Sequence, residues 1–150
     1  MDTTLCLKRL VPCVLGACLG VAMLALVVIR TPVTHADSQD FQSPSGNIGC
    51  ALGLIPGGSS AQCDIGDRAW VLPNCPQNRP VSLTLGSAKG PEVYCHNVGS
   101  LLAPGLPTLG YGQTRSAGVI SCSSESSGIR CTNTGTGRFF SVSRESYQTG

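Results

Sequence analysis

Six cysteines are the residues of this sequence whose type and spacing most clearly predict chemistry. They are separated by 12, 11, 19, 26 and 8 residues: Cys50, Cys63, Cys75, Cys95, Cys122 and Cys131. An even number of spaced cysteines in an exported domain indicates a disulfide framework, because disulfides persist in oxidising compartments. None of them forms the Cys-x-x-Cys pair that is typical of zinc sites, so we expect neither a metal nor another cofactor.

The intervals between the cysteines also favour one pairing. An interval of eight or twelve residues places two cysteines near each other across an antiparallel hairpin, where facing Cβ atoms lie about 4.5–5.5 Å apart. The first two cysteines and the last two have such intervals, which leaves the middle two for each other. The expected bonds are Cys50–Cys63, Cys75–Cys95 and Cys122–Cys131.

Candidate catalytic residues are few. If the leader is removed, His96 is the only histidine, and no Gly-x-Ser-x-Gly nucleophile elbow accompanies it, so we assign no catalytic residue. Asp64 and Asp67 form the only close acidic pair of the globular part, which leaves an exported hydrolase as an alternative function. Beside Gly66, both aspartates are also typical of a turn.

The most suggestive binding residues lie near the C-terminus, where Arg138, Phe139, Phe140 and Arg144 combine two apolar rings with two guanidinium groups. Adjacent residues of a strand point to opposite faces, so we expect one phenylalanine to face away from the core. Arginine and aromatic residues are enriched at protein interfaces. These four residues are therefore a candidate binding surface.

The N-terminus has the parts of an export signal. Lys8 and Arg9 precede residues 10–29, a run of twenty residues without a charge, and Thr34 and Ala36 are small residues suited to a signal peptidase. We expect residues 1–36 to be a signal peptide.

Two alternatives to cleavage remain open. Residues 10–29 are long enough to anchor the protein in a membrane, and residues 15–18 resemble a lipobox that would be lipidated at Cys18. In all three cases the single disulfide-rich domain, residues 37–150, would be secreted or held in the cell envelope. That domain has seven basic and seven acidic residues, and this balance makes nucleic acid an unexpected partner.

Short apolar segments divided by turn residues predict an all-β domain of antiparallel hairpins. We expect strands at residues 47–54, 59–65, 69–72, 81–85, 92–96, 118–123, 129–132 and 139–143. Residues 45–50 are echoed by residues 117–122, and each copy continues to a second cysteine and then to aromatic residues. The echo predicts two disulfide-closed hairpins that pack face to face.

Several motifs follow one another along the domain: Phe41-Gln42-Ser43-Pro44-Ser45-Gly46-Asn47-Ile48-Gly49-Cys50, Cys63-Asp64-Ile65, the Trp70 segment with Pro73 and Cys75, Leu109-Gly110-Tyr111-Gly112, and Phe140-Ser141-Val142-Ser143-Arg144 with Tyr147. Together they resemble an uncharacterised family of small exported actinobacterial domains, of mycobacterial type. The resemblance implies export and a disulfide-stabilised β-rich domain, and it brings no catalytic residues. Members tend to close with Gly-His-Gly-Phe, where this chain has Gly137-Arg138-Phe139-Phe140.

These features favour a non-catalytic binding or interaction module whose partner is an envelope or extracellular protein or ligand. Besides the hydrolase, a second alternative is a protease-inhibitor-like module. In that case residues 98–109, which contain Pro104 and Pro107, would form the exposed inhibitory loop.

Overall fold

The computed structural model describes residues 38–96 and 100–150, which form ten β-strands and no helix. The expected all-β fold class is thus confirmed. Within these two ranges, no helix is long and apolar enough to cross a membrane.

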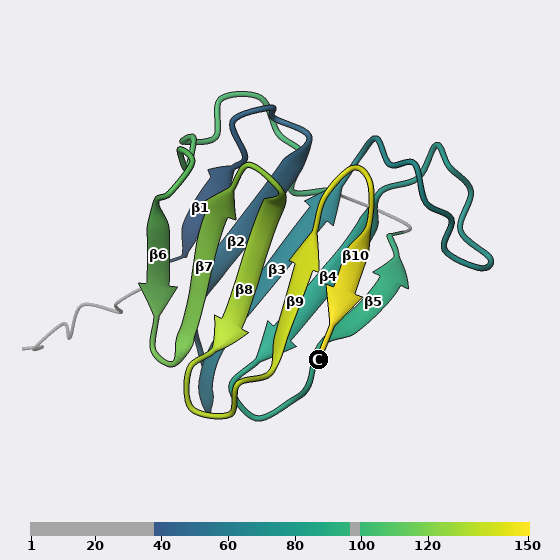
Figure 1. Ribbon diagram of the computed structural model, residues 1–150. Coiled ribbons are helices and arrows are strands. Elements are labelled where there is room, and N and C mark those ends of the chain that lie inside the picture. The colour runs from purple at the N-terminus through teal and green to yellow at the C-terminus, as the bar shows by residue number, and fades with distance from the viewer. Residues whose placement is uncertain (1–37, 97–99) are drawn as a thin grey trace, which may run out of the picture. The chain divides into compact units, whose positions relative to one another are not determined.

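The strands form two antiparallel sheets, and in each sheet the strands follow the order of the chain (Figure 1). The first sheet contains β1 (Gln39–Gln42), β2 (Ile48–Ile55), β3 (Gly58–Ile65), β4 (Val81–Gly86) and β5 (Glu92–Cys95). The second sheet contains β6 (Thr114–Ala117), β7 (Ile120–Glu125), β8 (Gly128–Asn133), β9 (Phe139–Val142) and β10 (Tyr147–Thr149). Each half of the domain therefore supplies one complete sheet.

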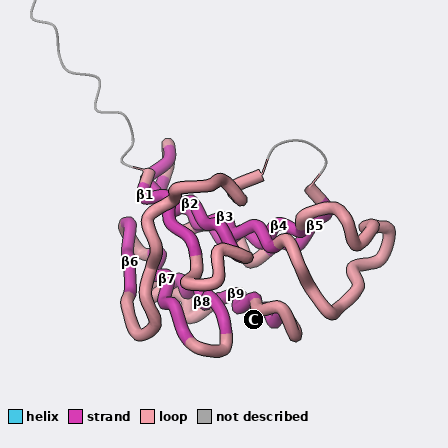
Figure 2. The backbone as a smooth tube through the Cα atoms, turned by 90° about the horizontal axis from the view of Figure 1, so that it is seen from above, coloured by secondary structure: helices cyan, strands magenta, loops and turns pink. Residues whose placement is uncertain are grey.

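The two sheets lie face to face as two layers (Figure 2). Side chains along the central strands alternate between the inside and the outside, as β8 shows: Ile129 and Cys131 are buried, whereas Gly128, Arg130 and Thr132 are partly exposed. This period of two is the pattern of a strand with one face on a core. The inward-facing residues of both sheets form a single apolar cluster.

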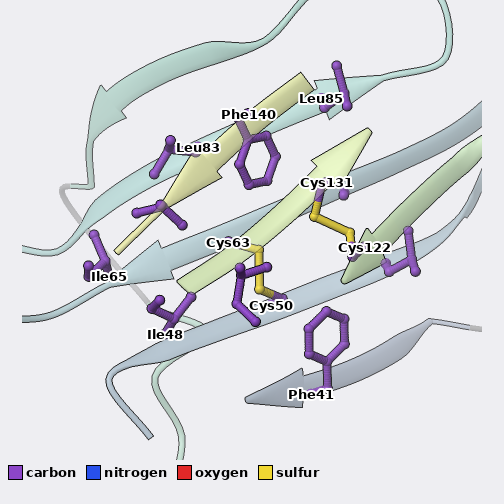
Figure 3. Packing of buried hydrophobic residues seen from close by; sticks show 14 of the residues in the cluster. Phe41, Ile48, Cys50, Cys63, Ile65, Leu83, Leu85, Cys122, Cys131 and Phe140 are labelled. Atoms are coloured by element: carbon purple, nitrogen blue, oxygen red, sulfur yellow. A yellow bond between two sulfur atoms is a disulfide. The ribbon is translucent and has the colours of Figure 1, made fainter. Parts of the chain in front are cut away.

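Two disulfides lie at the centre of this cluster (Figure 3). Cys50 faces Cys63 directly in the β2–β3 register, and Cys122 faces Cys131 in the β7–β8 register, with Cα separations of 4.1 and 4.0 Å. These are the two hairpins that the internal echo predicts, one in each sheet. The four cysteines are completely buried, so the disulfides also contribute to the packing of the core.

The third disulfide, Cys75–Cys95, joins the long β3–β4 connection to β5, so all three bonds follow the expected pairing. Arg68, which belongs to the same connection, also stabilises it through hydrogen bonds. Its guanidinium group is almost fully buried and donates to the backbone carbonyls of Arg79, at 2.7 Å, and Pro76, at 3.1 Å. The connection is thus fixed by a covalent bond and by charge-assisted hydrogen bonds.

The predicted strand at residues 69–72 is wrong, because this segment is an irregular part of the β3–β4 connection. Its apolar side chains have different roles. The Trp70 ring packs against Tyr147, with 4.6 Å between centroids, and its Nε1 donates to the carbonyl of Ser143. Val71 is 69% exposed. The other seven predicted segments all contain strands, whereas β1, β6 and β10 were not predicted.

Candidate functional site

The structure brings together the three residue types of a serine hydrolase, Asp64, Ser82 and His96, on the outer face of the first sheet. Asp64 faces Ser82 in the β3–β4 register, and the Ser82 hydroxyl donates to Asp64 Oδ1 at 2.7 Å. His96 Nδ1 lies 2.6 Å from Ser82 Oγ and 3.7 Å from Asp64 Oδ2. An ionised Asp64 takes the one hydroxyl proton of Ser82, and Ser82 Oγ is then the acceptor for an Nδ1–H of the imidazole.

This order of hydrogen bonds does not activate the serine. In a catalytic triad the histidine lies between the serine and the aspartate and accepts the hydroxyl proton. Here Ser82 lies between the other two residues, and both Ser82 and Asp64 have no exposed surface. The group is therefore a buried polar network.

The Asp64 carboxylate also holds the segment that covers this face. Oδ2 accepts the backbone N–H of Leu101 at 2.8 Å, and Oδ1 accepts from Gln62 Nε2 at 3.0 Å. Gly49 lies beneath the same segment, where any side chain would overlap the carbonyl of Leu101. Asp64 thus links β3, β4 and the segment that follows β5.

We expect Asp64→Ala to lower the free energy of unfolding by about 3 kcal/mol, because Ser82 Oγ and the N–H of Leu101 would lose their acceptor inside the protein. Asp67→Ala is the matched control, since Asp67 is exposed and uses only its backbone to bond Asn47. Its effect should stay within about 0.5 kcal/mol. Urea unfolding of both variants measures the difference, and equal losses would contradict this role of Asp64.

The two aspartates of the predicted acidic pair therefore have different places. Asp64 lies under the segment that follows β5, whereas Asp67 lies at the end of the sandwich, where it lines a cavity. The backbone of Asp67 is fixed by Asn47, whose Oδ1 accepts its N–H at 2.7 Å and whose Nδ2 donates to its carbonyl at 2.8 Å.

The four candidate binding residues near β9 do not share one surface. Phe140 is completely buried in the core, and Phe139 faces outward beneath the guanidinium group of Arg130, which lies 3.6 Å from the ring centroid. The two rings thus point to opposite faces, as expected. Arg138 and Arg144 lie beyond the opposite ends of β9. Arg144 lines the same cavity as Asp67.

This end cavity has a volume of about 350 Å³ and is formed by loops at the end of the sandwich that lies at the top of Figure 1. Its lining residues are Ser43, Ser45, Asn47, Ile48, Asp67, Tyr111, Glu125, Ser126, Ser127, Gly128, Ser143, Arg144 and Glu145. The loops come from both sheets. The sequence alone predicts no role for Tyr111 or for the serines, although Tyr111 lies within the Leu109-Gly110-Tyr111-Gly112 motif.

Tyr111 is the one large aromatic ring in the end cavity, and it is 61% exposed. Its turn is held against the second sheet, because the N–H of Gly112 donates to the carbonyl of Ser124 at 2.7 Å and the N–H of Gly110 donates to the side chain of Gln113 at 2.7 Å. Gly112 has a φ of 78°, a conformation that favours glycine. The backbone on either side of the exposed ring is therefore well anchored.

A second cavity, of about 260 Å³, adjoins the end cavity on the second sheet. Its lining residues are Glu125, Ser127, Gly128, Ile129, Arg130, Ser141, Val142, Ser143, Ser146 and Gln148. Four residues line both cavities, namely Glu125, Ser127, Gly128 and Ser143. We call the two cavities together the polar trough.

Comparisons of the chain with protein families, with curated proteins and with solved structures find no match. Within residues 38–96 and 100–150, no group of three or more His, Cys, Asp or Glu side chains could hold a metal ion. The chemistry of the polar trough is therefore the basis for a functional proposal.

Proposed function

We propose that this protein is an exported, non-catalytic binding module that holds its ligand in the polar trough. The observation that carries the proposal is the exposed Tyr111 ring, which stands among hydroxyl, carboxylate and guanidinium groups in the end cavity. Binding sites combine a concave surface with a few polar groups that fix the orientation of the ligand. The three disulfides are compatible with a location outside the cytoplasm.

The sandwich suits binding because it holds the loops of the trough rigidly. The β7–β8 turn that carries Ser127 is the turn of the hairpin that the Cys122–Cys131 disulfide closes. The Glu125 carboxylate accepts from Ser123 at 3.1 Å and from Ser127 at 3.3 Å, which orders the turn further. A preorganised site loses less conformational entropy when its ligand binds.

The hydrolase alternative has less support. Asp64 is buried and already accepts three hydrogen bonds, so it is not placed to act on a substrate beside Asp67. The inhibitor alternative depends on residues 98–109, of which 98 and 99 lie outside the described residues. The remainder is fixed by hydrogen bonds at two places. The backbone N–H of Leu101 donates to the Asp64 carboxylate, and the backbone N–H of Leu109 donates to the carbonyl of Gln42.

NMR spectroscopy can test the proposal. We expect extracts of the host's envelope and culture medium to shift the amide signals of Tyr111, Ser127 and Ser143 in the disulfide-bonded protein. Tyr111→Ala should weaken these shifts about tenfold, because the ring is the one large, exposed apolar side chain that lines the trough.

The control variant is Tyr94→Ala, which removes a 39%-exposed ring from β5, on the other sheet. It should leave the response of the trough unchanged. Amide shifts confined to residues outside the trough, or a response equal in the two variants, would contradict the proposed site.

A further inference from the structure

The lining of the polar trough identifies the class of its ligand, provided that the trough is the binding site proposed above. Seven of its lining residues are serines, and its two amide side chains are Asn47 and Gln148. The aliphatic lining residues, Ile48, Ile129 and Val142, are at most 4% exposed and belong to the core. Apart from Tyr111, the exposed side chains that a ligand would meet are therefore polar or charged.

The charges of the trough are nearly balanced. The carboxylates of Asp67, Glu125 and Glu145 are accompanied by the guanidinium groups of Arg130 and Arg144. A polyanion would be repelled by three carboxylates, and a polycation would meet two guanidinium groups. Because both signs occur along the trough, a neutral ligand with many hydrogen-bonding groups fits it best.

Hydroxyl groups of a ligand suit this lining because each of them can both donate and accept a hydrogen bond. A ligand hydroxyl can donate to a carboxylate or to a serine, and it can accept from a guanidinium group or an amide. The Tyr111 ring, which is 61% exposed, adds an apolar face of about the size of one sugar ring, against which aliphatic C–H groups can pack.

The geometry points to a neutral oligosaccharide as the ligand of the polar trough. One sugar ring lies on Tyr111 in the end cavity, and the chain continues past the β7–β8 turn toward Arg130 and Gln148. The two cavities, of about 350 and 260 Å³, meet at Ser127 and Ser143, so the site is extended and takes more than one sugar unit.

Titration with defined probes tests the ligand class. The probes are cellotetraose, maltotetraose, mannotetraose and N-acetylchitotetraose, with tetralysine and tetraglutamate as charged comparisons. At least one tetrasaccharide should shift the amide signals of both Tyr111 and Arg130 to saturation. We expect its Kd to rise at least tenfold in Tyr111→Ala and to stay unchanged in Tyr94→Ala.

Treated extracts distinguish this inference from the proposed function. Periodate cleaves vicinal diols, which 1,4-linked hexoses have and 1,4-linked N-acetylglucosamine lacks. Treatment with periodate, or with a chitinase where N-acetylchitotetraose is the probe that binds, should therefore abolish the shifts that the envelope and medium extracts cause, whereas protease treatment should not. Two results would contradict a saccharide ligand: shifts that survive periodate and chitinase and disappear after protease treatment, or saturation of the trough by tetralysine alone. Either result would still support a binding function for the trough. If neither extracts nor probes shift the trough, both proposals fail.

Discussion

Phe140→Ala is expected to lower the free energy of unfolding by about 3–5 kcal/mol, the usual cost of removing a fully buried aromatic ring. The ring lies in the shared core of the two sheets and faces Cys131 in the β8–β9 register (Figure 3). Its removal would leave a cavity beside a disulfide, in a part of the core that has little freedom to collapse. Denaturant unfolding with the disulfides intact measures the loss.

The neighbouring ring provides the matched control. Phe139 is only partly buried, on the outer face, and its contact with Arg130 is at the surface. Phe139→Ala should therefore cost about 1 kcal/mol. The assignment of Phe140 to the core and of Phe139 to the outer face fails if the two variants lose the same stability or if their order is reversed.

Removing a central disulfide should have an effect of similar size. We expect the double variant Cys50→Ala with Cys63→Ala to lose about 2–5 kcal/mol, because the unfolded chain gains freedom and two completely buried sulfur atoms leave the core. Thermal unfolding of the double variant beside the parent protein measures this loss.

The comparison with the third disulfide separates the two causes. The sequence separation of Cys75–Cys95 is 20 residues, against 13 for Cys50–Cys63, so chain entropy alone predicts the larger loss when the third bond is removed. We expect the opposite order, since Cys95 lies only partly buried at the edge strand. A larger loss for the Cys75 and Cys95 variant would show that the central bond acts through the unfolded chain alone.

The sequence predicted the central strands better than the edges. Alternating apolar residues and the cysteine intervals indicate the β2–β3 and β7–β8 hairpins, because these strands bury one face completely. The edge strands β1, β6 and β10 are three or four residues long and mostly polar, so hydrophobic periodicity cannot find them. At 69–72, four consecutive apolar residues imitate a strand, although Trp70 and Leu72 pack at the margin of the core and Val71 is exposed.

The candidate site could not be read from the sequence for a different reason. Tyr111, Asp67 and Glu125 are far apart in the chain and meet only because loops from both sheets lie at one end of the sandwich. The network of Asp64, Ser82 and His96 likewise depends on strand register, which places Asp64 opposite Ser82. A change of one residue in that register would turn these side chains to the other face.

The pairing of the cysteines has a consequence for how an exported chain would mature. Along the domain, the first cysteine bonds the second, the third bonds the fourth and the fifth bonds the sixth: Cys50 with Cys63, Cys75 with Cys95, and Cys122 with Cys131. When a chain crosses a membrane from its N-terminus, each cysteine therefore meets its correct partner before any later one arrives. Oxidation in order of appearance would yield the native bonds directly, so maturation of an exported chain would require an oxidant but no reshuffling by a disulfide isomerase.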